Sequence, residues 1–277
     1  MRKSAGLLII LTSVLLFTSL MVAEAAPAEL ASQWSPVIRG DNTGDGLTAQ
    51  QNIFTLVNYD CDWRLNNNWY NLLFFPMKRV MYYSVVESDT HYFIGYYQYY
   101  PRHIGGRGHE HDLTGVLLAI DKTPDGSGQL TMLLTYSDNK WRHWPGSRVR
   151  LEGGHPVLNI RAGSHVITVA GGSSRAWPAS LYELPAAGQA FNKTLPGGAH
   201  GGYRLVPLAE LWERRQDIGQ GRVFARWGVF DSYNEAPVTV PWVWEYRRLN
   251  WLKQPGELVQ YFQGQPVQAC NYLSNPY

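Results

Sequence analysis

The sequence predicts an all-β protein, a single-domain β-sandwich with long functional loops and at most one or two short helices. Aromatic and β-branched residues recur in short runs typical of strands, within a chain that holds 17 Tyr, 11 Trp and 9 Phe. The runs are separated by turn-forming residues, drawn from 27 Gly and 16 Pro. Helical periodicity is scarce. Many strands at short spacing with few helices favour a sandwich.

Seven runs are expected to form strands, and their ranges are 71–77, 79–88, 91–100, 114–120 and 129–137, with two more inside 155–170. Between two of them, DKTPDGSG at 121–128 has the Pro-Asp-Gly chemistry of a hairpin turn. The helix candidate is 208–218, where Leu208, Leu211 and Trp212 share one face.

Residues 1–25 have the pattern of a signal peptide. Arg2 and Lys3 precede a long apolar run, and the small residues at Ala23–Ala25 fit a cleavage site. The apolar run is short for a membrane span, although an uncleaved anchor is the alternative. We therefore expect a secreted or periplasmic protein, with a mature chain of residues 26–277 that forms one domain and has no transmembrane span.

The charge balance gives no reason to expect a nucleic-acid partner. Residues 1–25 contain two of the 24 basic and one of the 22 acidic side chains, so the mature chain carries 22 and 21. The basic residues are also scattered along the chain rather than clustered. A near-neutral protein without a basic patch lacks the electrostatic attraction that nucleic-acid binding requires.

Two cysteines, Cys61 and Cys270, lie near the two ends of the mature chain. In an oxidising compartment we expect them to form a disulfide that ties the C-terminal tail to the N-terminal region. The alternative is a pair of free thiols. A zinc site is not expected here, because neither cysteine has a second ligand at the usual spacing.

Histidines and an acid are concentrated between the expected strands 91–100 and 114–120. The loop at 101–111 is longer than a hairpin turn needs, and functional side chains are often found in such loops. At the start of the second strand, Asp112 faces one side and His111 the other, while His109 can turn toward Asp112. An imidazole and a carboxylate placed in this way suit half of a metal site or an acid/base pair.

The second half of the site is expected from the segment 153–166, GGHPVLNIRAGSHV. Its Gly163–Ser164 gives the backbone freedom to turn the next side chain into a cleft. His165 would approach Asp112 if this segment packs beside 114–120. Histidines that are only solvated loop residues are the alternative.

The segments QYYPRH (98–103) and GHEHDLTGVLLAI (108–120) resemble the core motif of the necrosis-inducing (necrosis- and ethylene-inducing peptide-like) proteins. That family has a tyrosine-rich strand ending in Pro-Lys-Asp, then a Gly-His-Arg-His-Asp-Trp-Glu heptad. The heptad is matched by Gly108, His109, His111 and Asp112 and is not matched by Glu110, Leu113 and Thr114. HPVLNIRAGSHVI (155–167) and PWVWEY (241–246) are similar to segments of vacuolar-protein-sorting-sixty-two-like proteins and their bacterial relatives.

The resemblance implies a β-sandwich that holds a divalent cation in a cleft. Carried over residue by residue, His109 and Asp112 are ligands, while His103 and Thr114 stand where the necrosis-inducing family has carboxylates. A set of His103, His109, Asp112 and His165 therefore favours Zn²⁺ or another transition metal. Loss of two carboxylates makes Ca²⁺ or Mg²⁺ less suitable, although the identity of the ion stays open.

Three functions fit this pattern. The first is a secreted, non-enzymatic, toxin-like protein that binds membrane-lipid or glycan headgroups with the help of the cation and contacts them through Trp and Tyr loops. The second is a metal-dependent hydrolase, in which a metal-bound water is the nucleophile and Glu110 or His111 is the general base. The third is an envelope or surface structural protein with a vestigial site.

Overall fold

The computed structural model describes residues 27–40, 50–105, 108–169, 182–187, 202–219, 224–232 and 237–277. The predicted signal peptide lies outside these residues. Within the described ranges, no helix combines the length and the apolar composition needed to cross a bilayer.

The larger sheet has seven strands in the order β11-β2-β3-β4-β5-β6, with β14 also paired to β2. From β2 to β6 each strand pairs antiparallel with the next one in sequence, whereas β11 pairs parallel with β2. The strands are β2 (Val80–Ser88), β3 (His91–His103), β4 (His109–Asp121), β5 (Gln129–Ser137), β6 (Lys140–Pro145), β11 (Arg204–Pro207) and β14 (Tyr272–Ser274). The predicted strands 79–88, 91–100, 114–120 and 129–137 and the hairpin turn at 121–128 are thus confirmed.

The smaller sheet has five strands in the order β10-β1-β8-β7, with β9 also paired to β8. The strands are β1 (Val37–Gly40), β7 (Leu151–Glu152), β8 (His155–Ile160), β9 (Ile167–Val169) and β10 (Tyr182–Leu184). The two strands predicted inside 155–170 are β8 and β9. A separate two-stranded ribbon joins β12 (Glu245–Tyr246) to β13 (Leu249–Asn250).

The described residues contain five short α-helices, more than the one or two that the sequence predicts. They are α2 (Pro27–Gln33), α4 (Asn68–Asn71), α5 (Ala209–Glu213), α6 (Phe224–Trp227) and α7 (Pro255–Gln263). Single-turn 3₁₀ helices are η1 (Leu65–Asn67), η2 (Gly146–Arg148) and η3 (Pro241–Val243). The predicted helix 208–218 is confirmed only in its first half, as α5. The predicted strand 71–77 is wrong, because α4 and turns occupy this segment.

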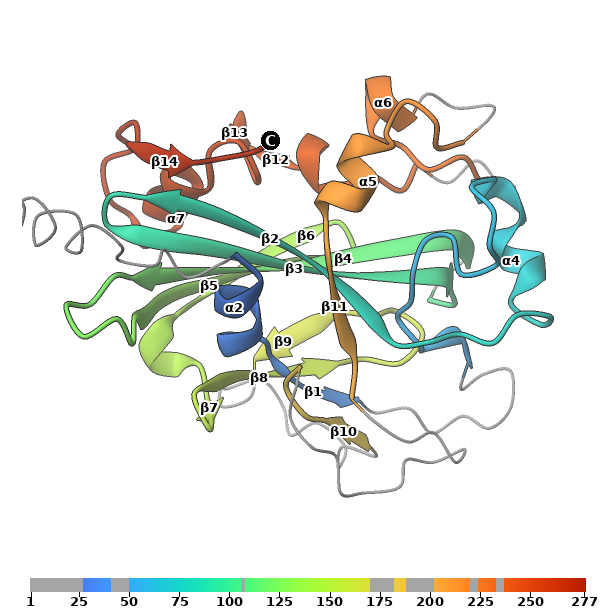
Figure 1. The fold of residues 1–277 in the computed structure, drawn as a ribbon, viewed down its shortest axis with the longest axis horizontal. Helices are drawn as coiled ribbons and strands as arrows, with labels where there is room; N and C mark the ends of the chain where they lie inside the picture. Colours follow the sequence, from blue (N-terminus) through green and yellow to red (C-terminus); the bar gives the residue numbers. More distant parts are fainter. Residues whose placement is uncertain are drawn as a thin grey trace, which may run out of the picture.

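These elements form three layers (Figure 1). The large sheet is in the middle, the small sheet packs on one face, and a C-terminal layer with α5, α6, α7 and the β12–β13 ribbon covers the other face. The predicted β-sandwich is therefore confirmed.

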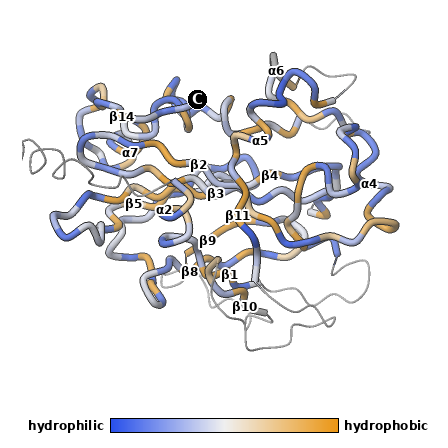
Figure 2. Tube along the Cα trace, in the orientation of Figure 1, coloured by the Kyte–Doolittle hydropathy of each residue, from blue (hydrophilic) through white to orange (hydrophobic). Residues whose placement is uncertain are grey.

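The large sheet is buried on both faces. Toward the small sheet, Ile94 and Leu118 pack in one cluster with Ile38 and Leu158. Toward the C-terminal layer, neighbouring strand residues pack with the buried indoles of that layer. A strand covered on both sides needs non-polar residues in succession, which explains the unbroken run at 115–120. Figure 2 shows hydrophobic residues along the strands and hydrophilic ones at the exposed turns.

Gly115 in β4 lies directly under the C-terminal layer. A Cβ at this position would lie 2.5 Å from Cζ3 of Trp244 and 3.4 Å from Cζ2 of Trp251. We expect Gly115→Ala to lower the free energy of unfolding by about 1–3 kcal/mol, because large buried rings must move to admit the methyl group. Urea unfolding measures this, with Gln129→Ala at the exposed start of β5 as the control. An unchanged stability would show that the indoles can move freely.

The predicted disulfide between Cys61 and Cys270 is wrong, because both cysteines are free. Cys61 lies in a turn shortly before α4, where its backbone NH donates to the carbonyl of Asn58. Cys270 lies before β14 and packs on Gly256 in α7. Since α4 and β14 lie at opposite ends of the molecule (Figure 1), the two cysteines lack the short Cα separation that a disulfide requires.

Candidate functional site

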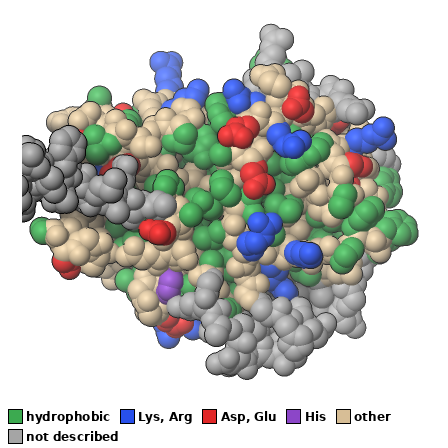
Figure 3. Space-filling model, in the orientation of Figure 1, with side chains coloured by type: hydrophobic (Ala, Val, Ile, Leu, Met, Phe, Trp, Pro, Cys, Tyr) green, Lys and Arg blue, Asp and Glu red, His purple; other side chains and the backbone are tan. Residues whose placement is uncertain are grey.

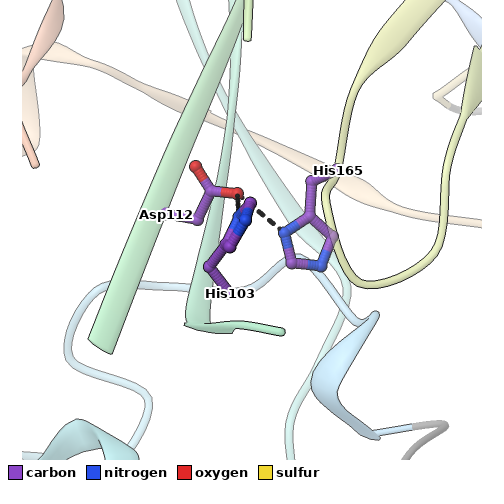
Figure 4. A group of neighbouring side chains, drawn as sticks. All are labelled: His103, Asp112 and His165. Atoms are coloured by element: carbon purple, nitrogen blue, oxygen red, sulfur yellow. Dashed lines mark hydrogen bonds and ion pairs between the residues drawn. The ribbon is translucent and has the colours of Figure 1, made fainter. Parts of the chain in front are cut away.

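Three buried side chains meet at one end of the sandwich. His103 is the last residue of β3, Asp112 is in β4, and His165 is in the loop between β8 and β9 (Figure 4). Nδ1 of His103 lies 2.9 Å from Oδ2 of Asp112, and Nδ1 of His165 lies 2.8 Å from the same oxygen. We call this group the triad. Both imidazoles donate to one carboxylate oxygen, so Asp112 fixes the orientation of both rings.

A local backbone distortion in β4 brings His109 to the side of Asp112. Regular alternation along β4 would place His109 on the same face as His111, opposite Asp112. However, His111 has a φ of 62°, in the left-handed region, and the faces exchange there. The His109 ring stacks on that of His103 with 4.5 Å between centroids, while Glu110 turns away and accepts a hydrogen bond from the backbone NH of Trp69.

The predicted loop at 101–111 is shorter than expected. Strand β3 continues to His103, which pairs with His109 at the start of β4. Only residues 104–108 connect the two strands. The hairpin therefore positions both histidines on a paired backbone, which holds side chains more rigidly than a free loop.

His165 reaches Asp112 from the other sheet. The sequence placed it there on the condition that its strand packs beside 114–120, but β8 pairs with β1, β7 and β9 of the small sheet. The contact instead crosses the sandwich. His165 has a φ of 49°, and its ring stacks on Tyr100 with 3.6 Å between centroids.

Burial and the shared carboxylate set the ionisation of the triad. Burial alone would raise the pKa of Asp112, but hydrogen bonds from His103 and His165 lower it to about 2. Burial also acts to lower the pKa of His103, yet the bond and charge of Asp112 raise it above its ordinary value. For His165 burial prevails, and its pKa is lowered. At neutral pH the site thus contains a carboxylate and a neutral, fully buried imidazole.

The triad has the donor chemistry of a metal site. Its three donor atoms lie within 4.8 Å of one another. Tetrahedral bonds of about 2.0–2.1 Å separate neighbouring ligand atoms by roughly 3.3 Å, so the 2.8–2.9 Å contacts need to widen by only a few tenths of an ångström. Two imidazoles and one carboxylate fit Zn²⁺ better than Ca²⁺ or Mg²⁺, which prefer oxygen.

A pocket of about 170 Å³ opens beside the triad. His103, His109 and Asp112 contribute one wall. The other walls come from the β5–β6 turn and the segment before η3, with lining residues Leu113, Tyr136, Asp138, Asn139, Pro237, Val238 and Thr239. The pocket therefore combines carboxylates, an amide, a hydroxyl and an aromatic ring in a volume suited to a small polar group.

Asp138 and Asn139, which enclose the pocket opposite the histidines, were not expected from the sequence. Asp138 and Asn139 both have positive φ, 53° and 52°, and form the two-residue turn between β5 and β6. Such a dipeptide is a recognisable hairpin signal. The turn alone does not reveal that it lies opposite His103, because that depends on the order of strands in the sheet.

The proposed general bases do not face the pocket. Both nitrogens of His111 are engaged: Nε2 donates to the carbonyl of Asp231 at 2.8 Å, and Nδ1 accepts from the hydroxyl of Tyr99 at 2.8 Å. Burial lowers the pKa of His111 to about 3. Glu110 is fully buried and bonded to Trp69. The structure therefore does not bring either residue into the lining of the pocket.

Gly105 leaves room for the His103 ring. A Cβ on Gly105 would lie 2.6 Å from Nε2 of His103, although the backbone there is not left-handed. We expect Gly105→Ala to fold but to push the ring away from Asp112, so that the pKa of His103 falls. An NMR titration of the histidine ring measures this. Gly202→Ala, whose Cβ would meet Pro185 at an ordinary 3.5 Å, is the control. An unchanged His103 pKa would contradict the expectation.

No family model matches the chain, and neither does any curated protein. Solved structures do match. NLPPya in complex with glucosamine is 14% identical, covers 79% of this chain and 86% of its own, and has a TM-score of 0.45. A structure described as a toxin fold for microbial attack and plant defense is 17% identical, with 79% and 87% covered and a TM-score of 0.42.

A further match is Necrosis and Ethylene inducing Protein 2 from the causal agent of cocoa's Witches Broom disease. It is 18% identical over 55% of this chain and 72% of its own, with a TM-score of 0.35. These solved structures are necrosis- and ethylene-inducing toxin-fold proteins, the group to which the first resemblance in the sequence points. The resemblance to vacuolar-protein-sorting-sixty-two-like proteins stays an expectation.

Proposed function

We propose that this protein is a secreted, non-enzymatic, toxin-like protein that binds a small headgroup of a glycan or membrane lipid in the pocket beside the triad. In this proposal His103, Asp112 and His165 hold a divalent metal ion, with zinc preferred. The observation that carries the proposal is the convergence of two buried imidazoles on one buried carboxylate oxygen at the wall of a small polar pocket.

The lining of the pocket supports a headgroup as the occupant. Its volume of about 170 Å³ is below the roughly 300 Å³ at which sites for larger ligands begin, so it suits one sugar ring or one headgroup. Asp112 and Asp138 supply two carboxylates, and Asn139 and Thr239 supply further polar groups. Tyr136 lines the pocket with its ring packed against Trp141 and Trp244, so it adds a firmly held apolar surface. Hydroxyl and ammonium groups on a compact ring complement this set.

The metal would act by neutralising and ordering the site. When bound, it supplies positive charge that attracts a ligand hydroxyl or phosphate oxygen. Asp112 would then be a metal ligand that also lies between the two histidines, one from each sheet. His109 lies outside this ligand group, stacked on His103, where it supports the ring and lines the pocket.

The test is calorimetric titration of the mature chain with glucosamine, a ligand in one of the similar solved structures, chosen because its ammonium group complements the pocket carboxylates. We expect binding in the presence of zinc and about tenfold weaker binding after chelation. Asp138→Asn, which leaves the triad intact, should weaken binding several-fold without changing zinc uptake. Equal heats for wild type, chelated protein and variant would contradict the proposal.

A further inference from the structure

Three large side chains project into solvent in and just after α4. Tyr70, Leu73 and Phe74 are 50%, 63% and 75% exposed, and we call them the apolar tip. Phe74 is the most exposed of the large hydrophobic residues described. Single exposed apolar residues are ordinary on protein surfaces, but three within five positions on one turn are a patch that suggests a contact.

The apolar tip is held in place by the residues around it. Leu72, between them, is buried in the protein. The backbone NH groups of Phe74 and Phe75 both donate to the carbonyl of Asn71, and the Asn71 side chain donates to Asp60 at 2.7 Å. The turn is thus built to present these side chains outward, and their exposure is not the result of a loose end.

The tip lies at the same end of the molecule as the triad. Helix α4 contacts the ends of β3 and β4, and Arg102 of β3 stacks 3.5 Å over the ring of Trp69 in α4. At this end the tube of Figure 2 is orange next to α4, and Figure 3 shows hydrophobic side chains along the corresponding edge. Ile104, in the β3–β4 turn, adds a further side chain that is 40% exposed.

We infer that the apolar tip inserts into the interfacial region of a lipid bilayer and so orients the molecule on a membrane. This inference rests on the proposed function, because it names the surface from which the pocket would meet a headgroup. Convex apolar and aromatic side chains suit the boundary between headgroups and acyl chains. Lys78 and Arg64, both exposed, lie within six residues of the tip in the sequence, and positive charges of this kind complement lipid phosphates.

The charges and the size of the patch favour a bilayer over another protein. The acids nearest in sequence are engaged within the turn, Asp60 with Asn71 and Asp62 with Asn67. Three side chains on a convex turn bury far less than the roughly 800 Å² per partner that a stable dimer needs. A second copy of the chain is therefore the weaker candidate.

The experiment is co-sedimentation of the mature chain with vesicles of phosphatidylcholine and a minor share of phosphatidylglycerol. We compare wild type with the double variant Leu73→Ser/Phe74→Ser. Leu273→Ser is the matched control, since Leu273 is 58% exposed but lies in β14 at the opposite end. We expect the membrane partition coefficient of the double variant to fall by on the order of 100-fold, and that of the control to change by less than about twofold.

The outcomes separate this inference from the proposed function. Zinc uptake and glucosamine binding are measured on the same variants and should not change. Vesicle binding that is absent in wild type, or equal in all variants, overturns the inference while zinc and glucosamine binding test the pocket independently. A concentration-dependent dimer in sedimentation velocity that the double variant loses also overturns it, in favour of a second copy.

Discussion

Replacing Asp112 with asparagine is expected to lower the free energy of unfolding of the metal-free protein by about 2–4 kcal/mol at neutral pH. Asp112 is 7% exposed and accepts both buried imidazole contacts through one oxygen. An amide has the same shape but no charge, so two charge-assisted hydrogen bonds are weakened or lost. Urea unfolding with a two-state fit measures the difference.

Asp138→Asn is the matched control for this prediction. Asp138 faces the same pocket but pairs with Lys140 at the surface, with 42% of its side chain exposed. Its loss should change stability by less than about 1 kcal/mol. If Asp112→Asn were as stable as wild type, the contacts of the triad would add nothing to stability. That result would favour the alternative of a structural protein with a vestigial site.

The second large effect is a loss of stability in acid, which we expect to begin below pH 6.5. His111 has an ordinary pKa of 6.5 in the unfolded chain, whereas burial lowers its pKa to about 3 in the folded protein. As the pH falls below 6.5, the unfolded state binds a proton that the folded state does not. Stability should therefore fall by about 1.4 kcal/mol per pH unit from this residue, which amounts to about 5 kcal/mol between the two pKa values.

The other members of the site modify this slope. The pKa of His165 is also lowered, so its contribution has the same sign. The pKa of His103 is raised, so its contribution is present at low pH and is lost as the pH rises through the folded pKa. Asp112, with a pKa lowered to about 2, contributes stability that is lost as the pH falls from 3.8.

Denaturant titrations of metal-free protein at several values of pH between 7 and 4 measure this dependence. His111→Asn is the comparison, because asparagine tolerates the left-handed φ of 62° and does not titrate. The variant should be less stable at neutral pH, since the carbonyl of Asp231 and the hydroxyl of Tyr99 each lose the hydrogen bond to His111. Its free energy of unfolding should also fall less steeply as the pH is lowered, by an amount that corresponds to at most one bound proton. Parallel slopes would show that folding does not change the pKa of His111.

Much of the large sheet was predictable because its strands are long, aromatic and bounded by turn residues. The exception at 71–77 has the same composition as a strand, but Leu73 and Phe74 face solvent and Leu72 alone is buried. Apolar content does not tell a buried strand from an exposed apolar turn. A strand differs from such a turn in that it pairs with another strand, and the local sequence does not show where that other strand lies.

The candidate site was predictable in its residues more than in its geometry. His103, Asp112 and His165 were expected to meet, and the structure brings them together. The exchange of faces at His111 was not foreseen, because a histidine with positive φ inside a strand breaks the period of two. That exchange explains why His109 lies on the pocket side while Glu110 and His111 do not.

The most direct test of the metal site is zinc uptake by the mature chain after chelation, with His165→Gln and His109→Gln as a matched pair. His165 donates to Asp112, whereas His109 stacks on His103 and has no hydrogen bond to Asp112 among the described contacts. Wild type and His109→Gln should each take up one zinc ion per chain, and His165→Gln should bind zinc at least about 10-fold more weakly. Absence of uptake by wild type, or equal uptake by the two variants, would contradict a metal held by His103, Asp112 and His165.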